Sequence, residues 1–157
     1  MKKPALSLFL GATLVITTLS ACDSTKSDLS NYSKTAVPVY NSYSNKFGAE
    51  MEASSKFTTE AEYAAQTKEV VALLDEFRTK MAEFKPETKE VQDLNQNEVT
   101  NLTNLEDGYK QLAEAFEKDD KAIGQSAKAK IEDAIKADEK FRADLKALED
   151  KHHVQVQ

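Results

Sequence analysis

The spacing of apolar residues is the feature that most restricts the fold of this chain. Between residues 34 and 151 an apolar side chain returns every three or four positions, with few departures. This interval places side chains on one face of an α-helix, whereas a half-buried strand alternates apolar and polar residues. The stretch contains no sustained alternation, and its glycines and prolines stand at boundaries or isolated sites. The spacing therefore predicts an all-α protein.

A capping signal separates the first two predicted helices. The first is short and runs from Pro38, which suits the first turn of a helix, to about Ser55. The second begins at Thr59, because its hydroxyl and the carboxylate of Glu62 can each satisfy a free backbone amide of the other residue. The first seam consists of Tyr40, Tyr43, Phe47 and Met51, and the second of Tyr63, Thr67, Val70, Leu74, Phe77, Met81 and Phe84.

A proline and an acidic pair divide the rest of the chain into two long helices. Pro86 disfavours a helical conformation at Lys85 and itself starts a helix well. The third helix ends near Glu117, and Asp119 or Asp120 caps the fourth. The third stripe consists of Val91, Leu94, Glu98, Leu102, Leu105, Tyr109, Leu112 and Phe116, and the fourth of Ile123, Ala127, Ile131, Ala134, Asp138, Phe141, Leu145 and Leu148.

Short connections between these segments favour helices that fold back on one another. We expect an antiparallel up-and-down bundle of four helices, the first shorter, with coiled-coil-like seams over residues 36–151. Residues 152–157 are expected to form a disordered tail. Two alternatives stay open. One is a single extended coiled coil, and the other is a three-helix bundle with the first helix loosely docked.

The first 21 residues have the composition of a secretory signal peptide. Lys2 and Lys3 supply positive charge, and a diluted apolar stretch from Ala5 to Leu19 follows them. A membrane-spanning helix needs about 20 predominantly apolar residues, which this stretch does not reach. We therefore expect residues 1–21 to be removed from the mature protein.

The only cysteine of the chain stands directly after this stretch. The sequence Leu19-Ser20-Ala21-Cys22 closely resembles the lipobox of bacterial lipoproteins. The resemblance implies cleavage before Cys22, a diacylglyceryl thioether on its sulfur and often an acyl group on its new amine. Two or more acyl chains anchor a protein durably to a membrane. The alternative is an ordinary cleaved signal followed by an incidental cysteine.

The residues after the cysteine bear on location. Residues 22–35 are polar and lack a sustained period, so they predict a flexible tether between the lipid and the bundle. Asp23 resembles the inner-membrane retention signal of enterobacteria-like lipoproteins, which implies the periplasmic face of the inner membrane. Where that rule does not apply, the outer membrane or the cell surface is expected.

The charge of the mature chain disfavours nucleic-acid binding. Removal of residues 1–21 takes away two lysines and no acidic residue, so the formal charge changes from −6 to −8. Such a surface repels nucleic-acid phosphates and anionic headgroups. We therefore expect contact with the membrane through the lipid alone, no nucleic acid, and another envelope protein as partner.

The sequence gives little support for catalysis. Carboxylate-bridged metals in a bundle require Glu-x-x-His motifs in the core, but His152 and His153 both lie in the predicted tail. Covalent haem attachment requires a Cys-x-x-Cys-His motif, which a single cysteine cannot form. We expect no enzyme, no metal site and no cofactor other than the covalent lipid on Cys22.

Two acidic residues interrupt the apolar stripes. Glu98 lies on the third stripe and Asp138 on the fourth, and facing carboxylates in a bundle core would have raised pKa values. The interpretation we favour is a slight rotation of both helices. Val99 and either Ala137 or Ile135 would then take the inner places, with the acids at the boundary.

An uncharged stripe, here called the amide face, runs along the third helix. Asparagine and glycine are weak helix formers, so helix stability does not explain it. We expect this face to dock another envelope component; alternatives are a chance run in solvent or an intramolecular boundary with the first helix. Empty volume in the core would instead favour a binding module or chaperone-like bundle that holds an apolar ligand or an unfolded client. The amide face consists of Asn97, Asn101, Asn104, Gly108 and Gln111.

Overall fold

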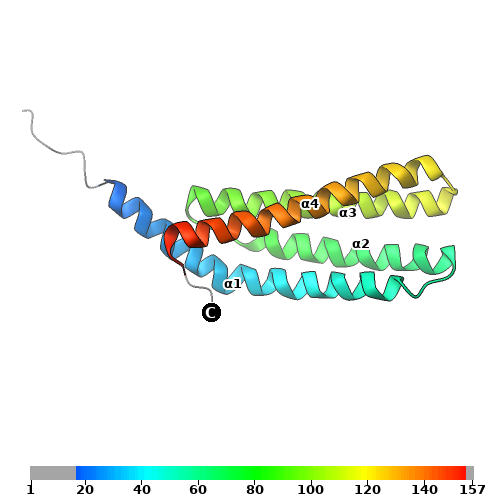
Figure 1. Ribbon diagram of the computed structural model, residues 1–157, viewed down its shortest axis with the longest axis horizontal. Helices are drawn as coiled ribbons and strands as arrows, with labels where there is room; N and C mark the ends of the chain where they lie inside the picture. Colours follow the sequence, from blue (N-terminus) through cyan, green and yellow to red (C-terminus); the bar gives the residue numbers. More distant parts are fainter. Residues whose placement is uncertain (1–16, 155–157) are drawn as a thin grey trace, which may run out of the picture.

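Four helices make up the part of the chain that the structure describes. The computed structural model describes residues 17–154, with side chains from Ser24 onwards. The helices are α1 (Thr17–Ser54), α2 (Glu60–Glu83), α3 (Lys89–Lys118) and α4 (Lys121–His152), and no strand occurs in residues 17–154. Figure 1 shows them running back and forth along one long axis, joined by short turns. The prediction of an all-α up-and-down bundle is confirmed.

The helix α3 is the central element of the bundle. It packs extensively along both α2 and α4, whereas α1 packs mainly on α2. Figure 1 shows that α4 draws away from α1 towards the turn that joins α3 to α4. The alternative of a single extended coiled coil is therefore wrong, and the uneven packing of α1 leaves one side of the bundle more open than the others.

Local hydrogen bonds fix the ends of the helices. The predicted capping box is present, because Glu62 N donates to Thr59 Oγ1 over 3.3 Å and Thr59 N donates to Glu62 Oε2 over 2.9 Å. Asp120 caps α4, with its Oδ1 accepting from the backbone amides of its second and third following residues. Asp119 closes α3 in the left-handed region, at φ 50°.

The start of α3 depends on a residue from α1. The helix begins at Lys89, after Thr88, and not at Pro86. Asp28 Oδ2 accepts from Glu87 N over 3.0 Å, from Thr88 N over 2.8 Å and from the Thr88 hydroxyl over 2.7 Å. A carboxylate that satisfies free amides at a helix N-terminus stabilises that helix. The first helix is thus joined to the turn between α2 and α3.

The first helix corrects the predicted tether and the predicted length. Residues 22–35 lie in α1, which at 38 residues is the longest of the four helices, not the shortest. Leu29 is 0% exposed and Tyr32 is 3% exposed. Both continue the seam of Ala36 and Tyr40 towards the N-terminus, so the burial of these apolar side chains outweighs the weak helix preference of the surrounding serine, asparagine and aspartate. The flexible tether is therefore wrong.

The C-terminal tail is also shorter than predicted. The helix α4 includes His152, whose Nε2 lies 3.1 Å from Glu90 Oε2, and Lys151 Nζ lies 2.8 Å from Glu90 Oε1. Val154 packs against the core. Disorder from residue 152 is therefore wrong for residues 152–154, and residues 155–157 lie outside the described residues.

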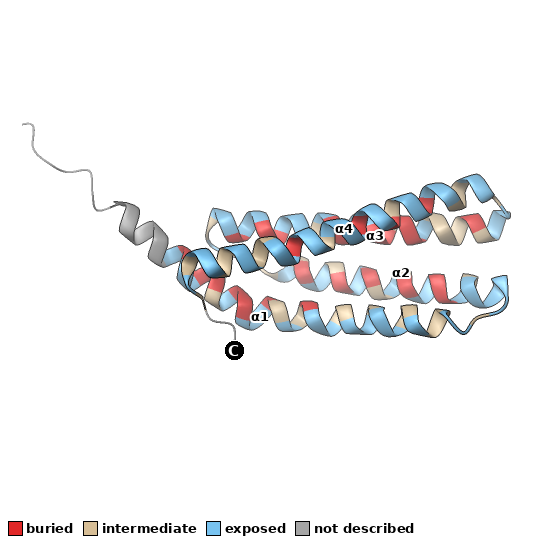
Figure 2. Ribbon diagram, in the orientation of Figure 1, coloured by how far each residue is buried: buried red, intermediate tan, exposed pale blue. Residues whose placement is uncertain are grey.

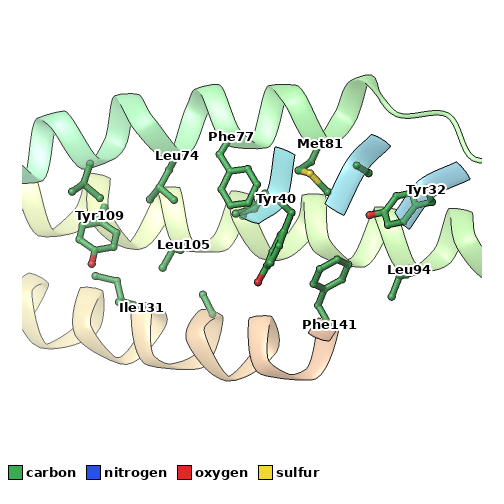
Figure 3. Packing of buried hydrophobic residues seen from close by; sticks show 14 of the residues in the cluster. Tyr32, Tyr40, Leu74, Phe77, Met81, Leu94, Leu105, Tyr109, Ile131 and Phe141 are labelled. Atoms are coloured by element: carbon green, nitrogen blue, oxygen red, sulfur yellow. The ribbon is translucent and has the colours of Figure 1, made fainter. Parts of the chain in front are cut away.

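Most of the core follows the predicted seams, but Tyr63, Phe116 and Ile123 lie outside it. Figure 2 shows buried residues as stripes on the inner sides of the helices, and Figure 3 shows how the aromatic and aliphatic side chains meet. Tyr63 was expected in the second seam but is 38% exposed, with its ring edge-on to Phe57. The buried apolar cluster consists of Leu29, Tyr32, Ala36, Tyr40, Val70, Leu74, Phe77, Met81, Val91, Leu94, Leu102, Leu105, Tyr109, Ile131, Ala134 and Phe141.

Candidate functional site

All four helices contribute to a pocket of about 170 Å³ near the middle of the bundle, here called the central pocket. Its floor comes from apolar side chains of α2 and α3, and its opposite sides come from α1 and α4. A cavity of about 150 Å³ is large enough to hold a benzene molecule. The central pocket is lined by Ser44, Phe47, Leu74, Phe77, Asn101, Leu102, Leu105, Ile135, Asp138 and Arg142.

The position of the central pocket follows from where α1 leaves α4. Two hydrogen bonds join these helices on one side of it: Ser33 Oγ donates to Glu149 Oε1 over 2.8 Å, and the Tyr40 hydroxyl donates to Asp138 Oδ1. Phe47, two turns further along α1, lies in the pocket wall instead. The central pocket therefore begins where the direct contacts between α1 and α4 end.

A polar cluster closes that side of the central pocket. Figure 3 shows Tyr40 reaching from α1 between Phe77 and Phe141, with its hydroxyl towards α4. Arg142 Nε donates to the same hydroxyl over 2.8 Å, and Arg142 Nη2 forms an ion pair with Asp138. Burial, followed by the hydrogen bond and charge of Asp138, raises the pKa of Tyr40 well above its usual value. The phenol therefore stays protonated and acts as a hydrogen-bond bridge.

Glu98 is fully buried beside this cluster, at 0% exposure. Its Oε2 accepts a long hydrogen bond of 3.5 Å from Asn101 Nδ2, while its Oε1 is buried with no hydrogen-bond partner. Burial first, and then the charge of Asp138, raise the pKa of Glu98 to about 8, although Asn101 and Arg142 oppose the rise. At pH 7 the Glu98 carboxyl is mainly protonated.

The rotation that would bring both acids to the boundary does not occur. Glu98 takes an inner place, while Val99 is only half-buried. On α4, Ile135 is 44% exposed and Ala137 is exposed, whereas Asp138 is half-buried. The rotation fails because it would also move the leucines that share the face of Glu98, one turn on either side, away from the core. The favoured interpretation is therefore wrong in its rotation and for Glu98, whereas Asp138 does lie at the boundary of the core.

The amide face lies partly inside the bundle. Asn101 is 5% exposed and Gly108 is buried, and a Cβ at Gly108 would lie only 2.8 Å from Ile131 Cγ1 of α4. Gln111 is half-buried, and only Asn97 and Asn104 are exposed. The expected docking surface is therefore wrong for Asn101 and Gly108. Gly108 lies at an intramolecular boundary with α4, so the alternative of a boundary with the first helix is wrong there as well.

Two polar links that cross the bundle were not predicted from the sequence. The Tyr32 hydroxyl donates to Asn95 Oδ1 over 3.0 Å, and Asn95 Nδ2 donates to the backbone oxygen of Met81 over 3.2 Å. The second link is the cluster of Tyr40, Asp138 and Arg142. Its readable signal was the spacing of Asp138 and Arg142, an i,i+4 ion pair on one helix.

Other expectations meet the structure only in part. Leu19, Ser20, Ala21 and Cys22 lie in the first turns of α1, but their side chains are outside the described ones, as are residues 1–16 of the predicted signal peptide. Within residues 17–154, no three His, Cys, Asp or Glu side chains are grouped to hold a metal ion. Over the same range, the helices lack the length and apolar character needed to cross a membrane.

Comparison of the chain with protein-family models, with curated proteins and with solved structures finds no match. The proposals below therefore depend on the residues of this chain and their chemistry.

Proposed function

We propose that this chain is a lipid-anchored protein of the cell envelope that acts by non-covalent binding. The lipobox-like sequence ending at Cys22, the only cysteine, supports a covalent lipid at that position. The bundle would then lie outside the cytoplasm, at the periplasmic face of the inner membrane where the Asp23 rule applies. Where the Asp23 rule does not apply, the bundle would be anchored to the outer membrane or the cell surface.

The central pocket carries the proposal that the bundle is a binding module for an apolar ligand. Ligand sites in proteins are concave and mostly apolar, with a few polar groups that orient the ligand. The pocket has this character, because Phe47, Leu74 and Phe77 form apolar walls and Asn101 adds an amide. The amide face supports the alternative of surface docking less well, since Asn101 and Gly108 are buried within the bundle.

Contact with another envelope component is the second candidate. It is favoured by Ile135, a large apolar side chain that is 44% exposed at the rim of the central pocket. A partner protein that inserts one side chain into the pocket would cover Ile135 as well.

Photo-cross-linking in cells tests the proposal with the lipid anchor intact. A benzophenone amino acid replaces Ile135 at the pocket rim, and in a matched control it replaces Ala137, which is exposed on the same helix and does not line the pocket. We expect an adduct at position 135 and not at 137. The mass of the adduct separates a small ligand from a partner protein. Equal adducts at both positions, or none at either, would contradict binding at the central pocket.

The Cys22→Ser variant tests the anchor separately. Loss of the thiol removes the site of the diacylglyceryl group, so the variant should leave the membrane fraction or keep its first 21 residues. Intact-mass measurement of a membrane-bound protein with a free thiol at Cys22 would contradict lipidation.

A further inference from the structure

Two neighbouring oxygen atoms near the central pocket have no hydrogen-bond partner. Asn101 lines the pocket, and its Oδ1 is buried without a partner. Glu98 lies one turn earlier on α3, and its Oε1 is also buried without a partner. Nearly all buried polar atoms in native proteins are paired. Asn101 Nδ2 already faces Glu98 Oε2, so its Oδ1 is the acceptor that remains for a molecule in the pocket.

The charges around these acceptors favour a cation over an anion. Asp138 is compensated by its ion pair with Arg142 and by the hydroxyl of Tyr40. Within the described part of the chain no cation forms an ion pair with Glu98, although Asn101 donates to it and the charge of Arg142 partly offsets that of Asp138. Above about pH 8, where Glu98 is ionised, the cluster of Glu98, Asp138 and Arg142 therefore carries one uncompensated negative charge.

The volume and walls of the central pocket set the size of the ligand. The space of about 170 Å³ is enclosed mainly by Phe47, Leu74, Phe77 and Leu105. It exceeds the volume of about 150 Å³ that accepts benzene. An apolar body of about one six-membered ring therefore fits, with one polar group directed at Asn101.

We propose that the central pocket binds a small apolar primary amine, whose ammonium group donates to Asn101 Oδ1 and compensates the charge of Glu98. This inference rests on the proposed function, because it takes the same pocket as the binding site. An ammonium group offers three donors and no acceptor, which matches the unpaired Oδ1 of Asn101, the lining residue that contacts Glu98. A charge-assisted hydrogen bond is also stronger than one between neutral groups.

Binding of the ammonium competes with the proton on Glu98. Burial and the charge of Asp138 raise the pKa of Glu98 to about 8, and Asn101 and Arg142 lower it. Tyr32 of α1 also faces this carboxyl, while α2 contributes apolar walls to the pocket. An aliphatic amine stays protonated up to about pH 10. Its affinity should therefore rise by up to about tenfold per pH unit as the pH approaches 8 from below.

Three shape-matched probes test the charge of the ligand. Cyclohexylamine, cyclohexanol and cyclohexanecarboxylate share one ring and differ in the polar group. Calorimetric titration of the full chain in detergent at pH 8 should give at least about tenfold tighter binding for the amine than for the alcohol, as expected for one charge-assisted hydrogen bond. The advantage of the amine should shrink at least about tenfold at pH 6, where Glu98 is protonated.

Two glutamine variants separate Glu98 from a general effect of charge. Glu98→Gln should weaken amine binding at least about tenfold and leave alcohol binding within about threefold, which also reports that the pocket has formed. Glu106→Gln is the matched control, because Glu106 is a buried carboxylate of the same helix that is paired with Arg78 and Lys110. Neither carboxylate lines the pocket, but only Glu98 contacts the lining residue Asn101. This control should leave the binding of all three probes unchanged.

The outcomes distinguish this inference from the proposed function. Equal binding of amine and alcohol with no effect of Glu98→Gln would overturn the amine inference and leave an apolar binding module. Tightest binding of the carboxylate would overturn it in the same way. Failure of all three probes to bind would overturn the amine inference, while the cross-linking at Ile135 decides whether the pocket binds anything else.

Discussion

Replacement of Glu98 by glutamine should make the bundle more stable at neutral pH. The carboxyl is 0% exposed, and its folded-state pKa is about 8 against an ordinary value of 4.5. The folded state therefore keeps a proton that the unfolded chain loses at about pH 4.5. This contribution to stability is fully present below pH 4.5 and is lost as the pH rises towards 8.

The size of the effect follows from the same values. Each pH unit between 4.5 and about 8 costs the wild-type fold about 1.4 kcal/mol relative to the unfolded chain. Between pH 5 and pH 7 the cost grows by about 3 kcal/mol. Glutamine is nearly isosteric and does not titrate, so Glu98→Gln should gain about that much over the wild type across this interval.

Urea unfolding at pH 5, 6 and 7, followed by circular dichroism, measures the difference between the two proteins. Titration of all other groups cancels in this difference. Glu106→Gln serves as the control, because it removes two ion pairs, to Arg78 and Lys110, and should destabilise the fold. A difference between wild type and Glu98→Gln that stays constant within about 0.5 kcal/mol from pH 5 to pH 7 would refute the reasoning, since that is the scatter of neutral surface changes.

Three further predictions concern packing, each measured by urea unfolding. Gly108→Ala should lose up to about 2 kcal/mol of stability, because its Cβ would lie 2.8 Å from Ile131 Cγ1 and overpacking outweighs the gain in helix propensity. Gly48→Ala, with nothing within 4 Å of the added Cβ, should gain about 0.5–1 kcal/mol. Gains in stability at both sites would contradict the close approach of α3 and α4. Asn101→Arg should lower the free energy of unfolding by about 2 kcal/mol or more because it buries a charge, while Asn104→Arg, at an exposed site, should change it by no more than about 0.5 kcal/mol. Equal small effects at both sites would show that Asn101 is exposed to solvent. Leu74→Ala should cost about 2–5 kcal/mol, since Leu74 is 1% exposed, and a loss below about 0.5 kcal/mol would mean that this seam does not face the core.

The helices that the sequence predicted best are those whose apolar period is uninterrupted. The seam of α2 from Thr67 to Met81 is buried as expected, and the capping box at Thr59 fixes its start. The prediction of a flexible tether failed for residues 24–35 because Ser, Asn and Asp, which are weak helix formers, dominate their composition. The two buried apolar side chains there, Leu29 and Tyr32, owe their place to contacts with other helices. Tertiary packing overrides weak helix propensity here, and the composition of a short segment does not reveal that packing.

The candidate site was predictable in its parts but not as a whole. Glu98 lies on the apolar stripe of α3, and the three-four spacing of that stripe alone would have placed it in the core. The general rule that carboxylates avoid the core led instead to the prediction that Glu98 lies at the boundary. The bridge from Tyr40 to Asp138 and Arg142 spans about two-thirds of the chain, and only the i,i+4 pair on α4 was visible locally. The sequence of one chain does not say which helices are neighbours, so it could not bring these three residues together.

The continuous first helix bears on where a ligand would come from. At 1.5 Å per residue, Asp28 lies about 9 Å along α1 from the proposed lipid attachment at Cys22, and Phe47 lies about 38 Å along it. Asp28 also holds the turn between α2 and α3, so the bundle has little slack next to the anchor. In a bundle that stands away from the membrane, the central pocket then lies beyond the headgroups, since half of a bilayer with its headgroups is about 20 Å thick. A small amine that is soluble in water can reach such a pocket directly, whereas a lipid acyl chain would first have to leave the bilayer.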